Sequence, residues 1–187
     1  MIKPILLALV ATAGLAACSG PINRVDLVPL QSQLNLQANV STVIVRTVSL
    51  PSYAAAEELS IQSPEGLITS DGEILWADMP DRAATLAITR HLNEILSATV
   101  GPDPWPFSGL PDVAVEVRVQ EMLAGADGVF RLRGQYFIGG DGIDYRRIVR
   151  TFSYTAPLPV EGVGGVAAAQ SQVLLSLSED IARNLAR

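Results

Sequence analysis

The second half of the chain alternates apolar and polar residues with a period of two, which is typical of strands buried on one side. Valine alternates with mostly polar residues over 113–119, and residues 130–136 and 145–155 form two further strand-like runs. Residues 125–128 and 139–142 are rich in glycine and aspartate, which favour turns. The pattern therefore predicts three long strands joined by short connections.

The part of the chain before residue 80 predicts shorter strands. Residues 42–48 are rich in β-branched side chains, which favour a strand. Residues 59–62 and 73–76 predict two more, and Asp71-Gly72 between them is a typical turn signal.

Two segments have the period of an α-helix. The first begins at Pro80 and is predicted to end at Gly101-Pro102, and the second follows the glycine-rich residues 162–165. The first apolar stripe consists of Ala84, Ile88, Leu92, Ile95 and Leu96, and the second of Val166, Ala169, Val173, Leu177, Ile181 and Leu185.

The order of these elements predicts an α+β fold: a single mixed β-sheet of about six strands with two amphipathic helices packed on one face. The first helix would cross from Trp76 to Val113, which would allow those two strands to be parallel. The other face of the sheet would be polar and wet. It would be lined by Glu116, Arg118, Arg131, Arg133 and Gln135.

The N-terminal pattern is that of a lipoprotein signal peptide. Lys3 precedes an apolar run of 14 residues from Pro4 to Ala17, which is shorter than the roughly 20 residues of a spanning helix. Ala16 and Ala17 would also suit ordinary secretory cleavage, but Leu15-Ala16-Ala17-Cys18 resembles a bacterial lipobox. Cys18 is the only cysteine, and it is expected to carry a diacylglyceryl group and, as the new N-terminus, an N-acyl chain.

These features divide the chain into three predicted segments. Residues 1–17 are the signal peptide, residues 18–40 a lipid-anchored tether, and residues 41–187 the folded domain. Two or more acyl chains give stable membrane attachment. Ser19 stands where aspartate typically marks inner-membrane retention, so the sorting signal is similar to that of outer-membrane lipoproteins on the periplasmic face.

Composition restricts the class of protein. Without Lys3 the formal charge changes from −6 to −7, and the positive charges are twelve arginines. A net acidic chain without basic runs argues against nucleic-acid binding. The mature length suits one domain with its own core.

Two motifs in order resemble one lipoprotein family. Residues 46–53, Arg-Thr-Val-Ser-Leu-Pro-Ser-Tyr, are similar to the strand-ending V-x-L-P-x-Y of the PqiC-like ABC-type transport auxiliary lipoproteins. Residues 75–80, Leu-Trp-Ala-Asp-Met-Pro, resemble the R-W-A-E-P-L that opens the first helix of that family, although Leu75 replaces the arginine and Asp78 and Met79 depart from it. Residues 24–27 keep the leucine of a Y-x-L element without its tyrosine.

The resemblance implies a non-catalytic part of an envelope lipid-transport system. Such systems pair an inner-membrane ABC transporter with an MCE-domain periplasmic protein that forms a hydrophobic conduit, and the lipoprotein would dock that conduit at the outer membrane. A docking rim would favour a cyclic homo-oligomer. Two alternatives stay open: a scaffold for outer-membrane or lipopolysaccharide assembly, and a lipid-anchored periplasmic hydrolase.

Candidate chemistry is sparse, and no cofactor or metal is expected. His91 is the only histidine, lies off the main apolar stripe and is expected at the surface or its boundary rather than as a catalytic base. Asp141 and Asp144 suggest calcium but lack the further acids of an EF-hand loop, so a hairpin turn is favoured. Residues 162–165 precede a helix without the Gly-Lys-Ser/Thr ending of a phosphate-binding loop.

The remaining candidates concern packing and partner contact. Trp76 is expected in the core, and Trp105, between two prolines, either packs or meets a partner. Strand ends and the Trp105 loop are the first places to seek a docking rim. The candidate partner contacts are Leu50, Pro51, Tyr53 and Trp105. Arg146, Arg147 and Arg150 would meet acidic partners or headgroups, or form a solvated strand face.

Overall fold

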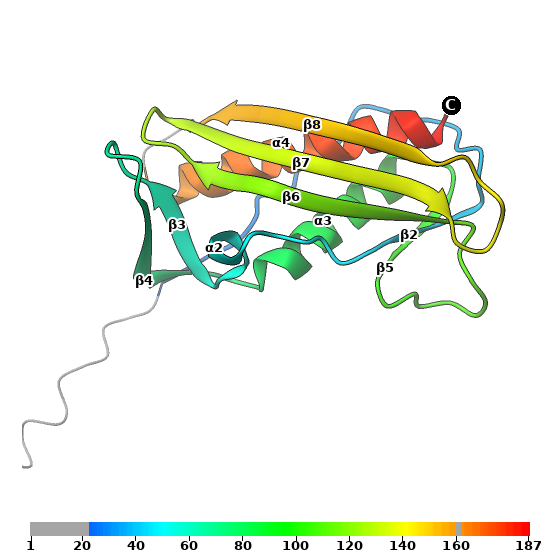
Figure 1. Cartoon of the computed structure of the whole chain (residues 1–187), viewed down its shortest axis with the longest axis horizontal. Helices are drawn as coiled ribbons and strands as arrows, with labels where there is room; N and C mark the ends of the chain where they lie inside the picture. The colour runs from blue at the N-terminus through cyan, green and yellow to red at the C-terminus, as the bar shows by residue number, and fades with distance from the viewer. Residues whose placement is uncertain (1–22, 160–161) are drawn as a thin grey trace, which may run out of the picture.

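The described residues of the protein form an eight-stranded mixed sheet with three helices (Figure 1). The computed structural model describes residues 23–159 and 162–187. The strands are β1 (Asn23–Val25), β2 (Thr42–Val45), β3 (Glu58–Gln62), β4 (Ile68–Trp76), β5 (Thr99–Pro102), β6 (Val113–Ala124), β7 (Val129–Gly140) and β8 (Ile148–Pro157). The helices are α2 (Ser52–Ala55), α3 (Pro80–Ile95) and α4 (Val163–Leu185).

The long meander β6–β7–β8 forms the body of the sheet. β6 and β7 pair antiparallel from Val113↔Gly140 to Ala124↔Phe130, and β7 and β8 pair in the same sense. Every second residue of β6 from Val113 to Val119 is buried, which confirms the predicted alternation. The register of the meander thus directs one row of valines into the core.

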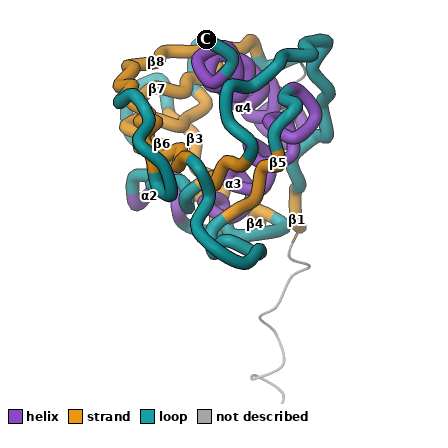
Figure 2. The backbone as a smooth tube through the Cα atoms, turned by 90° about the vertical axis from the view of Figure 1, so that its right-hand side faces the viewer, coloured by secondary structure: helices purple, strands orange, loops and turns teal. Residues whose placement is uncertain are grey.

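Helices α3 and α4 lie side by side behind this meander (Figures 1 and 2). His91 Nδ1 of α3 lies 3.1 Å from Ser178 Oγ of α4, which is a hydrogen bond between the two helices. The Tyr136 hydroxyl of β7 donates to Asp180 Oδ2 of α4 at 2.8 Å and accepts from Asn184 Nδ2 at 2.9 Å. Burial is the main cause, and the Asp180 carboxylate the second, that raises the pKa of the Tyr136 hydroxyl. The hydroxyl therefore keeps its proton and donates it to the hydrogen bond with Asp180.

The second edge of β6 is covered by three successive segments. β2 pairs with its beginning at Val43↔Val113 to Val45↔Val115, and β3 meets its end at Ile61↔Ala124. Between them, the Ser49 amide donates to the Val117 carbonyl at 3.0 Å, and the Tyr53 hydroxyl accepts from the Met122 amide at 3.2 Å. The Tyr53 side chain of α2 therefore satisfies the Met122 amide of β6, which lies between the parts of β6 that pair with β2 and with β3.

The predicted number of strands and the predicted end of the first helix were wrong. Among the described residues the sheet has eight strands rather than about six. Two were missed because β1 is only three residues long and β5 reads Thr-Val-Gly-Pro, which resembles the end of a helix. Gly101-Pro102 therefore lies in β5, and α3 already ends at Ile95. Both missed strands are at sheet edges, where proline and short length are tolerated.

The predicted turn at Asp71-Gly72 was also wrong. Both residues lie inside β4, opposite a register shift between Glu58 and Leu59 of β3, and the chain reverses instead at residues 63–67. Aspartate and glycine mark an irregularity of the ladder here. β4 is antiparallel to β3, which is parallel to β6, so the strands ending at Trp76 and starting at Val113 are not parallel.

The described part of the predicted tether packs on the domain. β1 pairs with β4 at Asn23↔Ile74, Leu36 forms a bridge with Leu96, and the Asn39 amide donates to the Leu185 carbonyl at 3.2 Å. Residues 1–17, Cys18 and Ser19 lie outside the described residues. The three segment boundaries stay predictions.

Replacing Tyr53 with phenylalanine should destabilise the fold, because the Met122 amide loses its acceptor in a largely buried place. We expect a loss of about 1–3 kcal/mol in the free energy of unfolding, measured by urea denaturation of the chain lacking residues 1–17. Ser52→Ala, at an exposed position of the same helix, is the matched control. Equal stability of Tyr53→Phe and the wild type would contradict the assigned bond.

Candidate functional site

Two loops meet at the end of the molecule opposite β1 and β4 (Figure 1). Residues 103–112 connect β5 to β6, and residues 141–147 connect β7 to β8. The Asp141 amide donates to the Asp112 carbonyl at 2.9 Å, so backbone contact joins the loops directly. We call this pair the distal loops.

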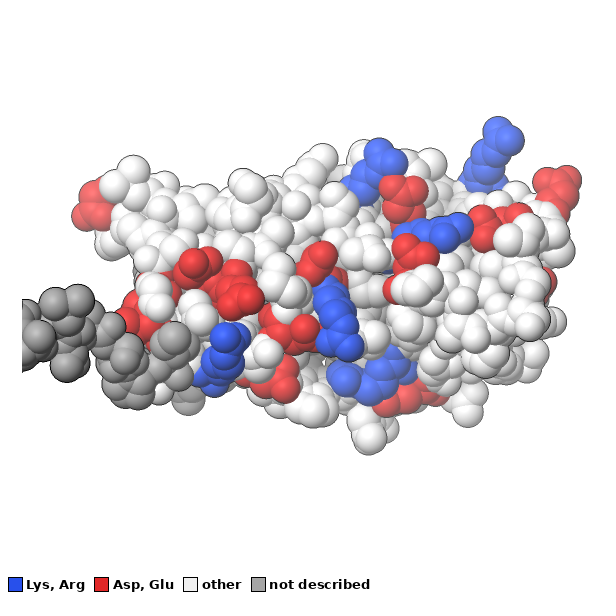
Figure 3. All heavy atoms as spheres, turned by 90° about the horizontal axis from the view of Figure 1, so that it is seen from below, with Lys and Arg blue, Asp and Glu red and all other residues white. Residues whose placement is uncertain are grey.

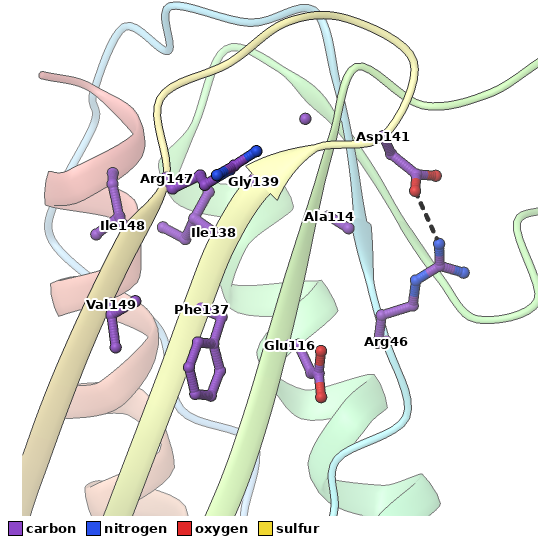
Figure 4. Close-up of a pocket in the computed structure, with 11 residues that line it drawn as sticks. Arg46, Ala114, Glu116, Phe137, Ile138, Gly139, Asp141, Arg147, Ile148 and Val149 are labelled. Carbon is purple, nitrogen blue, oxygen red and sulfur yellow. Dashed lines mark hydrogen bonds and ion pairs between the residues drawn. The ribbon is translucent and has the colours of Figure 1, made fainter.

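Arg46, which follows β2, links the distal loops through its side chain. Its Nη1 donates to Asp103 Oδ1 at 3.4 Å, and its Nη2 donates to Asp141 Oδ1 at 3.1 Å (Figure 4). All three side chains are partly exposed, so each pair contributes little to overall stability. Their effect is positional, because one guanidinium fixes two carboxylates on separate loops.

A shallow groove of about 400 Å³ runs from this link along the outer face of the sheet (Figure 4). Glu116 of β6, Phe137 of β7 and Val149 of β8 line it. The Arg118 guanidinium lies 5.2 Å from the centre of the Phe137 ring, in a cation–π contact. The groove combines apolar and charged groups, which suits contact with another macromolecule more than enclosure of a small substrate.

The tips of the distal loops expose large apolar side chains. Phe107 is 55% exposed, Leu110 is 73% exposed, and Ile143 on the other loop is 47% exposed. On this loop the sequence pattern indicated Trp105 as the partner contact, and it did not indicate these three residues. The available signal was their place in proline- and glycine-rich segments, where an apolar residue has little core to enter.

Trp105 supports this surface from beneath. Its ring lies over Gly101, where a Cβ atom would come within 2.8 Å of Trp105 Cζ3. The ring of Phe107 packs edge-to-face on it at 5.0 Å between centroids. Trp105 thus packs against the domain, and Phe107 is the more exposed aromatic of the pair.

The other predicted contacts lie elsewhere. Pro51 is the N-cap of α2, and Leu50 and Tyr53 are half-buried against the core beside it. In Figure 1 α2 lies away from the distal loops, so the structure does not bring Tyr53 and Trp105 together. Partner contact at Leu50, Pro51 and Tyr53 stays a prediction.

The prediction for His91 was wrong. Its side chain is 1% exposed, because α3 is covered by the sheet on one side and α4 on another. Burial, and secondarily the charge of Arg90, lowers the pKa of His91 to about 4. The imidazole is therefore neutral at pH 7 and holds two helices together.

The remaining candidates have structural surroundings. Asp141 pairs with Arg46, with 3.1 Å between its Oδ1 and Arg46 Nη2. Arg146 donates to the Asn184 carbonyl at 2.7 Å, which joins the loop to the end of α4. Trp76 is buried as expected, and Gly162 adopts a positive φ of 86° directly before α4.

Charges on the underside are mixed in sign (Figure 3). Acidic and basic side chains are interspersed on the face that Figure 3 shows, so this face presents no broad field of one sign to attract a polyanion or a polycation.

The family model of the ABC-type transport auxiliary lipoprotein component matches residues 26–182. The chain belongs to this family. Its members are auxiliary components of ABC-type transport, which places the protein among lipoproteins of a transport system. No curated protein matches the chain.

Solved structures share the fold of this family member. The crystal structure of an uncharacterized protein matches with a TM-score of 0.68 and 18% identity, over 88% of this chain and 99% of that one. The crystal structure of protein XCC0632 from Xanthomonas campestris, of family DUF330, matches with a TM-score of 0.63 and 18% identity, over 88% and 92% of the two chains. Within residues 23–159 and 162–187, none of the helices has the length and apolarity to span a bilayer.

Replacing Arg46 with glutamine should release both distal loops together. We expect faster amide hydrogen exchange over residues 103–111 and 141–147, with unfolding free energy changed by less than about 1 kcal/mol, because the ion pairs are partly exposed. Arg118→Gln, which breaks a pair with Glu116 on the same sheet face, is the control. Exchange that rises in one loop alone would contradict the proposed link.

The stability of the protein should fall in acid because of His91. In the unfolded chain the His91 imidazole has its ordinary pKa of 6.5, whereas in the folded protein its pKa is about 4. The unfolded state therefore binds a proton first, and stability that is fully present above pH 6.5 is lost as the pH falls from 6.5 to 4. We expect His91 to account for a loss on the order of 1–2 kcal/mol after allowance for screening. The measurement is urea denaturation at several pH values for wild type and His91→Gln. Identical pH profiles of the two proteins would contradict this assignment.

Proposed function

We propose that the protein is an outer-membrane lipoprotein that docks an MCE-domain periplasmic protein of an ABC-type lipid-transport system. Family membership supports the link to ABC-type transport. The observation that carries the docking role is the exposed apolar surface of Phe107, Leu110 and Ile143 on two loops held by one arginine. Exposed apolar side chains rimmed by polar groups are typical of protein interaction sites.

The arrangement of the ends suggests how this role works. β1, which follows the predicted lipid anchor at Cys18, lies beside β4, and the distal loops lie at the other end of the longest axis (Figure 1). An anchored chain would therefore direct the distal loops away from the outer membrane into the periplasm. Docking is a binding function, in which the subunit makes and breaks no covalent bond.

Rigidity favours the distal loops as a recognition site. Trp105 and Gly101 support Phe107, and the Asp112 carbonyl and Arg46 hold the second loop against the first. A preformed apolar surface loses little conformational entropy when it binds. Repetition of this surface in a cyclic homo-oligomer would give a ring of such contacts around a conduit.

The test is a mild-detergent pull-down of the tagged lipoprotein from its own membranes, with mass spectrometry of the bound proteins. Wild type should recover an MCE-domain protein in near-stoichiometric amount, and Phe107→Ser with Leu110→Ser should lower recovery at least tenfold, because the apolar tips are lost. Leu67→Glu, a 65% exposed residue near the opposite end, is the matched control. Equal recovery by the loop variant would contradict docking at the distal loops, and recovery of an outer-membrane assembly machine instead would favour the scaffold alternative.

A further inference from the structure

A second concave site lies at the end of the molecule near β1. It is a cleft of about 680 Å³, a size typical of ligand pockets. One wall is the β3–β4 hairpin, with Leu59, Ile61 and Ile74. The other is formed by the body of the domain, with Leu158 and Val166. The lining is therefore largely aliphatic.

The β3–β4 hairpin projects from the body of the sheet. β3 pairs with β6 at one position only, Ile61↔Ala124, and residues 68–73 of β4 are all exposed. Ile61, which lines the cleft, and Ile68 are aliphatic, and each is 44% exposed. The core thus leaves apolar surface uncovered along one wall of the cleft.

Charge restricts what the cleft would hold. Among the described residues that line it, Asp71 carries the one charge, and the others are apolar or uncharged polar. Such a lining offers no cation for a phosphate or carboxylate group. It suits a hydrocarbon chain whose head group stays outside, in water or at a membrane surface.

The position of the cleft supplies the source of such a chain. Asn23 of β1 pairs with Ile74, which lines the cleft, and Asn23 lies five positions after Cys18 in the sequence. Fully extended, five residues span at most about 18 Å. An anchored Cys18 would therefore hold the cleft within a short distance of the bilayer, among phospholipids.

We propose that this cleft binds one acyl chain of a membrane phospholipid, between the β3–β4 hairpin and the start of α4. The subunit would then contact lipid itself at the membrane end, while its distal loops bind the conduit protein. The choice of a phospholipid rests on the proposed transport function. The test uses purified protein without a partner, so its result is independent of the docking experiment.

The probe is lysophosphatidylcholine with a diazirine at the end of its single acyl chain, used below its micelle concentration. It is irradiated with the chain lacking residues 1–17 and carrying Cys18→Ser, and adducts are mapped by peptide mass spectrometry. We expect adducts on residues 58–76 and 162–170, with a tenfold loss in Ile61→Glu. Glycerophosphocholine, which has no acyl chain, should not compete.

Two controls separate the cleft from the rest of the surface. Leu86→Glu, at a 37% exposed apolar position of α3, and Leu67→Glu, near the hairpin tip but outside the lining, should keep wild-type labelling. Circular dichroism melts check that Ile61→Glu folds, and Ile61→Ser provides a second, milder variant. Labelling unaffected by both Ile61 variants, or lost equally in Leu67→Glu, would overturn the proposal.

The remaining outcomes concern other occupants. If the lipidated protein resists labelling while the Cys18→Ser chain accepts it, the anchor's own acyl chain fills the cleft and the assignment to a membrane phospholipid is wrong. If light scattering shows that Ile61→Glu separates copies of the chain, the cleft is an interface between copies, and this too overturns the proposal. Labelling of both forms that depends on Ile61 supports it.

Discussion

Strand β6 has hydrogen-bond partners on both edges, and the rest of the structure depends on this. On one edge it is paired with β7 along nearly its whole length. On the other, β2, Ser49, Tyr53 and β3 follow one another as partners. Because an unpaired buried amide is costly, segments distant in sequence are held to one strand. The same arrangement places the end of β2, and with it Arg46, beside the distal loops.

This central strand also separates the two ends of the molecule. Its first residue adjoins the loop that exposes Phe107 and Leu110, and its last residue lines the apolar cleft. Between these ends, the buried His91–Ser178 bond joins α3 to α4, and the Tyr136–Asp180 bond joins α4 to β7 of the sheet. A packed domain with a distinct surface at each end suits the proposed subunit that connects a membrane to a protein partner.

The sequence predicts the parts of this fold that rest on long periodic patterns. β6 and β7 follow from apolar–polar alternation and both long helices from a helical period, and Trp76 is buried as expected. β1 and β5 escaped prediction because a short edge strand is stabilised by its partner rather than by its own residues. His91 was misplaced for a similar reason, since a single apolar stripe does not show that α4 covers a second side of the helix.

The candidate site was predictable only in part. The proline-rich segment around Trp105 indicated a stiff exposed loop, but its meeting with residues 141–147 depends on the β7–β8 turn and on Arg46, which are far apart in sequence. The apolar cleft has no local signature at all, because its two walls come from β3–β4 and from the segments around α4. Surfaces made by tertiary contact need the fold before they can be recognised.

The orientation of the subunit is the central claim, and site-specific photo-crosslinking in living cells tests it most directly. A photoreactive amino acid is placed at position 107 in one strain and at position 67 in another. Position 107 should crosslink to the proposed MCE-domain partner, and position 67 should not. Crosslinks to that protein from position 67, with none from position 107, would contradict this orientation.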